Sequence, residues 1–106
     1  MSNGVLGASD LSAATDTIVY SVPTDTFAVI TINVVNRGAS TCTIRIALAT
    51  ANTPNNSEYI EYEAQVLPGG VLERTGVVVE ADRNVIVRSS AANAGAMVYG
   101  LETATA

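Results

Sequence analysis

The stretch FAVITINVVNRGASTCTIRIALA, residues 27–49, contains two apolar runs separated by the polar turn NRGAS, residues 36–40. Apolar side chains recur at every second position in both runs. This period of two is typical of β-strands, which point successive side chains to opposite faces. The turn supplies Asn, Gly and Ser, which tolerate the backbone angles of tight turns. The stretch therefore predicts two neighbouring antiparallel strands. The positions expected to point inward are Ala28, Ile30, Ile32, Val34, Cys42, Ile44, Ile46 and Leu48.

The same alternation continues along the chain, and helical spacing is sustained nowhere. Clusters of Gly, Pro, Asn and Asp separate the runs, as expected for connecting turns. The strands expected are Thr17–Val22, Phe27–Asn36, Thr41–Thr50, Glu58–Val66, Val71–Ala81, Asn84–Ser89 and Ala96–Glu102. Further inward positions expected are Ile60, Tyr62, Ala64, Val66, Val85, Val87, Met97, Tyr99 and Leu101. A chain of 106 residues has the size of one domain. We therefore predict an all-β fold, a single antiparallel β-sandwich (jelly-roll or Ig-like) of about seven strands.

The first residues, MSNGVLGASDLSA, differ from the rest because they are small and polar and show no clear period. Their only large apolar residues between Ser2 and Ala13 are Val5, Leu6 and Leu11. The pattern predicts an extended N-terminal arm over residues 1–13, followed by the sandwich domain over residues 14–106. The arm would become ordered against a neighbouring molecule. The alternative is a chain end without fixed structure, the commoner outcome for termini.

The chain is more apolar than one small interior requires. Apolar residues make up 48% and charged residues 14%, where about a quarter is usual, and the mean hydropathy is +0.32. On the strands around residues 27–36 and 71–81, apolar side chains also occupy the face that should meet water. We expect another subunit to cover them; a second layer of the same chain is the alternative. The expected interface residues are Val5, Leu6, Leu11, Phe27, Val29, Val35, Val77 and Val79.

Charge and chain chemistry argue against several classes of protein. The net charge is −5, with five arginines and no lysine, so a nucleic-acid partner is not expected. No apolar run approaches the roughly 18 residues of a membrane helix, so a membrane partner is not expected either. The chain has no histidine, which removes the usual catalytic triads and most zinc sites. We expect no cofactor and no metal.

The strongest acidic cluster is SEYIEYE, residues 57–63, in which Glu61 and Glu63 should point to one side of a strand. Two carboxylates can act as acid and base in glycoside cleavage, or as calcium ligands. A flat strand, however, offers neither a cleft nor the six or more oxygens of a calcium loop. A solvated face paired with Arg45 or Arg74 explains the same residues. The protein is therefore not expected to be an enzyme, and Cys42 is expected to act as a small buried hydrophobe.

Four strings within residues 20–102 carry a resemblance to a known group of proteins. They are NVVNRG (33–38), SEYIEYE (57–63), GGVLERTG (69–76) and VIVRSS (85–90). With them, about four-fifths of the chain resembles small β-rich structural proteins of tailed-bacteriophage virions. The strings contain no catalytic signature, so the resemblance implies a role in assembly and no active-site residues.

The resemblance implies a capsid decoration (cement) protein that binds over the joints between major capsid subunits. Its expected partners are the major capsid protein and further copies of itself, a homotrimer being favoured, and its expected location is the virion, after synthesis in the host bacterial cytoplasm. The alternative is a tail or fibre component, used as an adaptor or for host recognition. In that case the loops NTPNNS (52–57) and SAANAG (90–95) would carry specificity.

Overall fold

The computed structural model describes residues 3–105, which form eight β-strands and one 3-10 turn, η1. Alternating apolar residues produce strands almost wherever the period of two predicts them, within two residues at most ends. The bounds are β1 Asn3–Leu11, β2 Thr17–Ser21, β3 Thr26–Asn36, β4 Cys42–Ala49, η1 Asn56–Glu58, β5 Tyr59–Val66, β6 Val71–Val79, β7 Asn84–Ser89 and β8 Ala94–Ala104. The predicted all-β fold is confirmed, with eight strands in place of seven.

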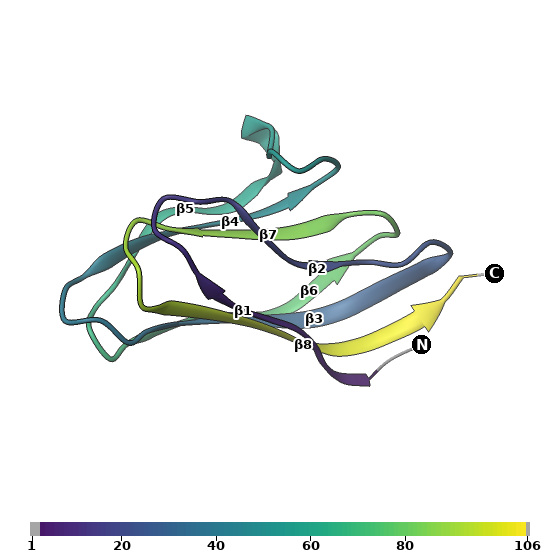
Figure 1. Ribbon diagram of the computed structural model, residues 1–106. Coiled ribbons are helices and arrows are strands. Elements are labelled where there is room, and N and C mark those ends of the chain that lie inside the picture. Colours follow the sequence, from purple (N-terminus) through teal and green to yellow (C-terminus); the bar gives the residue numbers. More distant parts are fainter. Residues whose placement is uncertain (1–2, 106) are drawn as a thin grey trace.

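The strands form two four-stranded antiparallel sheets that lie one above the other (Figure 1). Sheet A has the strand order β1-β8-β3-β6, and sheet B has the order β2-β7-β4-β5. Four of the pairings are nested about the β4–β5 connection: β4 with β5, β3 with β6, β2 with β7 and, outermost, β1 with β8. This is the pairing of one long hairpin of eight strands. Two further antiparallel pairings, β3 with β8 and β4 with β7, fold that hairpin into the two sheets.

The core lies between the two sheets and is aliphatic. The inward positions expected on β3 and β4 are buried there, except Leu48, which is partly buried. Leu48 lies one residue before the end of β4 and still packs against the core. Cys42 is buried at 1% exposure, as expected for a thiol acting as a hydrophobe.

The orientation expected for β8 is wrong. Met97 and Leu101 lie on the surface and Tyr99 is half-buried, whereas Ala94, Ala96 and Val98 face the core. The prediction chose the larger residues as the inward set, but the inner side of β8 is occupied by small side chains. On β5, Tyr62 is also exposed, because a bulge opposite Arg45 reverses the alternation after Glu61. The positions Val66, Val85 and Val87 are buried as predicted.

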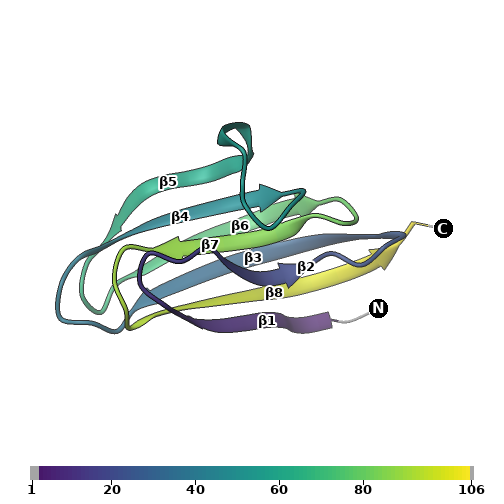
Figure 2. The same cartoon turned by 45° about the horizontal axis from the view of Figure 1, so that its top comes forward.

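The expected N-terminal arm is also wrong for the part of the chain that the structure describes; residues 1 and 2 lie outside it. Asn3–Leu11 is strand β1, which pairs along β8 at the edge of sheet A (Figure 2). The sequence concealed this strand because Gly4 and Gly7 interrupt the apolar pattern. Gly7 is required because the backbones of β1 and β2 approach closely at this point: a Cβ there would lie 2.1 Å from the carbonyl oxygen of Val19 in β2.

The two lateral edges of the molecule differ. At the β1–β2 edge, the Tyr20 hydroxyl donates a hydrogen bond of 2.5 Å to Glu102 in the opposite sheet. Burial, this hydrogen bond and the charge of Glu102 raise the pKa of Tyr20 well above its ordinary value. At the β5–β6 edge, an ion pair of 3.2 Å between Arg74 and Glu61 connects the sheets. Bulges in both of these edge strands discourage pairing with further strands.

Candidate functional site

The outer face of sheet A carries most of the exposed large hydrophobic side chains of the described residues. Among residues 3–105, nine large hydrophobic side chains are exposed, and six of them lie on the strands of sheet A. The six are Val5, Val29, Val71, Val78, Met97 and Leu101. Monomeric proteins rarely expose large contiguous apolar patches, and such patches mark interaction sites. This face is therefore the candidate functional site.

The interface residues expected from the sequence fall into three groups. Phe27, Val29 and Val35 lie on the outer face of sheet A, as expected. Val5, expected on an N-terminal arm, lies on the same face in β1. Leu6 and Val77 are partly buried and pack against the core. Leu11 and Val79 are core residues, each 2% exposed, so their side chains are not accessible to a partner. The prediction missed Val71, Val78, Met97 and Leu101. The opposite parity on β8 would have identified Met97 and Leu101. Val71 and Val78 are an odd number of positions apart and share a face only because of the bulge between Arg74 and Val77, which alternation does not reveal.

A polar band divides this face into two apolar parts. The band consists of Tyr99, Thr31, Asn33 and Glu73, and the Tyr99 hydroxyl donates a hydrogen bond of 3.1 Å to Glu73 across β3. This hydrogen bond raises the pKa of Tyr99. On one side of the band, Leu101, Val29 and Val78 lie in register on β8, β3 and β6. We name these three residues the Val29 ridge.

On the other side of the band the surface is hollow. The hollow, of about 490 Å3, is lined by Ala8, Val35, Gly95 and Met97, and the ion pair of Arg37 with Asp10 lies at its rim. Gly95 leaves its centre open because it has no side chain. We name this hollow the Gly95 groove.

The outer face of sheet B has a different chemistry. Glu63, Arg45 and Arg88 form a row of charges across β5, β4 and β7 that ends at Asp16, the residue before β2. Ion pairs of 3.0 Å between Glu63 and Arg45 and of 3.5 Å between Arg88 and Asp16 connect the row. The Arg45 guanidinium also lies 4.4 Å from the centre of the Tyr62 ring. Because Arg45 donates to Glu63, the pKa of Glu63 is lowered. This face is a solvated, ion-paired surface.

The expected pairing of Glu61 with Glu63 on one side of a strand is not realised. A bulge at residues 62–63 turns the chain between them, and Glu63 has a φ of +57°. Glu61 binds Arg74 at one sheet edge, while Glu63 binds Arg45 on the outer face. In the part of the chain that the structure covers, no group of three or more His, Cys, Asp or Glu side chains is arranged to hold a metal ion.

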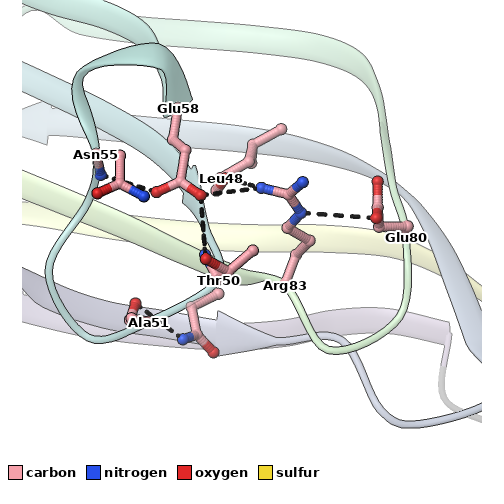
Figure 3. A network of polar contacts seen from close by, with 8 residues as sticks. Leu48, Thr50, Ala51, Asn55, Glu58, Glu80 and Arg83 are labelled. Atoms are coloured by element: carbon pink, nitrogen blue, oxygen red, sulfur yellow. Dashed lines mark hydrogen bonds and ion pairs between the residues drawn. The ribbon is translucent and has the colours of Figure 1, made fainter.

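Glu58 makes a network of hydrogen bonds that holds the long β4–β5 loop against Arg83, the residue before β7 (Figure 3). Its carboxylate accepts hydrogen bonds from the backbone N–H groups of Asn55 (2.8 Å) and Thr50 (3.2 Å) and from Arg83 (3.1 Å). Arg83 also donates to the carbonyl oxygen of Leu48 at 3.0 Å. The Asn55 hydrogen bond is the main cause that lowers the pKa of Glu58. The network therefore fixes the β4–β5 loop to the residue that precedes β7.

Acidification is expected to destabilise the protein through Glu58 and Glu63. Their pKa values are lower in the folded than in the unfolded chain, so their stabilising effect is complete above the unfolded value, about 4.3. The effect is lost as the pH falls through the folded values. We expect the melting temperature of Glu58→Gln to be lower than that of the wild type at pH 7, and to fall less steeply between pH 5 and about pH 3.

The control for this experiment is Glu80→Gln. Glu80 is 75% exposed and contacts Arg83 only at 3.8 Å, so its removal is expected to leave the melting curve almost unchanged. An acid dependence of Glu58→Gln equal to that of the wild type contradicts the role given to Glu58.

Within residues 3–105, no helix has the length and apolar character needed to span a membrane. No protein-family model matches the chain, and no curated protein and no solved structure is significantly similar to it.

Proposed function

We propose that this protein is a non-enzymatic structural subunit of a bacteriophage virion, a decoration protein that stabilises the capsid by binding over the joints between major capsid subunits. The observation that carries the proposal is the apolar outer face of sheet A, which needs cover from another molecule of an assembly, either the capsid or a further copy of this chain. Its six exposed apolar side chains lie outside a core that the inner faces of the two sheets already fill. Covering such side chains is favourable by about 25 cal/mol per Å2 of apolar surface.

The fold supports this role by analogy. We infer that the two sheets form a β-sandwich of jelly-roll type, because its pairing is that of a rolled hairpin of eight strands. An Ig-like sandwich joins neighbouring strands in a different order. Jelly rolls are frequent in viral capsid and lectin domains. A fold by itself does not determine a function, so this analogy adds to the evidence from the apolar face and does not replace it.

The local chemistry also supports assembly over catalysis. All five arginines are in ion pairs with acids of the same chain, and Glu61 and Glu63 have separate partners. A decoration protein needs no reactive group. Many copies on one lattice act together, so each contact contributes to retention even where it is weak.

The test is the place and number of copies in purified virions. Quantitative mass spectrometry is expected to find the protein in amounts comparable to the major capsid protein, and cryo-electron microscopy is expected to locate it on the outside of the head. A few copies at the tail favour the alternative, a tail or fibre component. Absence of the protein from the particles contradicts both.

A further inference from the structure

We propose that the outer face of sheet A binds the same face of a second copy of this chain across a two-fold axis. This pairing rests on the proposed role of the protein as an assembly subunit, and it names the molecule that covers the apolar face. It also favours a dimer over the trimer expected from the sequence, since two identical faces that meet directly are related by a two-fold axis.

The pattern of the face is self-complementary. The Val29 ridge lies on one side of the polar band and the Gly95 groove lies on the other. A two-fold axis along the band places the ridge of each copy over the groove side of its partner. The same axis brings band against band, so polar residues meet polar residues; Glu73 of each copy then faces Glu73 of the other, and each accepts the hydrogen bond of Tyr99 in its own chain. Leu101 on β8 and Val29 on β3 then face the same two strands of the partner, where the groove lies, and the contact occurs twice.

The shapes of the two apolar parts fit this arrangement. In the ridge, Val78 is 65% exposed and Leu101 is 56% exposed, so both project from the sheet. The groove has a volume of about 490 Å3 and is open at Gly95. A cavity of about 150 Å3 is enough to hold a benzene ring, so the groove has room for more than one aliphatic side chain.

The size of the face matches what a stable dimer needs. Its longest strands, β3 and β8, have 11 residues, and the sheet has four strands. At about 3.4 Å per residue and about 4.8 Å between strands, the face covers roughly 700 Å2. A standard protein interface buries about 800 Å2 on each partner.

The charges allow two copies to approach through this face. Asp10 is paired with Arg37, and Glu73 accepts the hydrogen bond of Tyr99. Other acids, such as Asp25 and Asp82, lie in the turns beyond the ends of the strands. Salt screens the remaining net charge of −5, so the main electrostatic cost of the association is the repulsion between the two Glu73 carboxylates.

The decisive variant is Gly95→Leu, which fills the groove. A Cβ at residue 95 meets its nearest neighbour, Val35, at 3.7 Å, an ordinary contact, so the chain is expected to fold. Analytical ultracentrifugation is expected to show a dimer for the wild type. For Gly95→Leu we expect the Kd of the dimer to rise at least about 100-fold, because symmetry places the change twice in the interface.

Two further variants complete the experiment. Leu101→Asp removes the ridge contact and is expected to give a monomer. Ile18→Asp is the matched control: Ile18 is 39% exposed but lies in sheet B, so the dimer is expected to persist. Circular dichroism checks that each variant is folded.

The proposal is overturned if the wild type remains a monomer up to millimolar concentration, or if folded Gly95→Leu and Leu101→Asp dimerise as the wild type does. A monomeric wild type that still occupies capsids overturns the dimer and leaves the decoration role intact. A dimer that is absent from virions overturns the decoration role and leaves the dimer intact.

Discussion

Replacement of Gly100 by alanine is expected to reduce the free energy of unfolding by about 3–5 kcal/mol. Gly100 lies in β8 between β1 and β3 and has a φ of +152°, a backbone angle that side chains rarely adopt. A Cβ there would lie 2.1 Å from the carbonyl oxygen of Val29 and 2.9 Å from the Cα of Ile30. Both neighbours are backbone atoms, so relief requires the strands themselves to move. Urea unfolding at fixed protein concentration measures the effect.

Gly69→Ala separates the steric effect from the cost of the backbone angle alone. Gly69 also has a positive φ, +75°, but no atom lies within 4 Å of the position of its missing Cβ. We expect a loss of about 1–2 kcal/mol for this variant. Equal losses for the two variants contradict the close approach of Gly100 to β3.

The second large effect is expected at Asn36, a buried polar residue at the end of β3, 2% exposed. Its side-chain amide donates to the carbonyl oxygens of Ser40 (2.8 Å) and Val66 (3.0 Å), and its oxygen accepts from the N–H of Gly38 at 2.9 Å. Asn36→Ala leaves these backbone groups without that partner. Each buried group left unsatisfied costs about 1–3 kcal/mol, so we expect a loss of about 2–4 kcal/mol in urea unfolding.

The matched control is Asn52→Ala, in the exposed β4–β5 loop, for which we expect a change below about 0.5 kcal/mol. A loss below about 1 kcal/mol for Asn36→Ala would mean that water replaces the side chain at these groups. In that case the Asn36 side chain does not fix the β3–β4 turn against strand β5.

The sequence was sufficient wherever local chemistry decides the outcome. The period of two and the turn residues identified seven of the eight strands, because both act over a few neighbouring residues. They also oriented β3, whose inward set Ala28, Ile30, Ile32 and Val34 is fully buried. The surplus of apolar residues correctly indicated an apolar outer face at Val29 and Val35.

The orientation of β8 and the existence of β1 were decided only by the tertiary structure. Both faces of β8 carry apolar side chains, so its sequence allows either orientation, and the register with β3 selects the one with Ala94, Ala96 and Val98 inside. Strand β1, interrupted by Gly4 and Gly7, is a strand because its backbone pairs with β8, more than 80 residues away in the chain. Backbone N–H and C=O groups are common to nearly all residues, so a strand that lacks an alternating apolar pattern carries little side-chain signal of the distant strand with which it pairs.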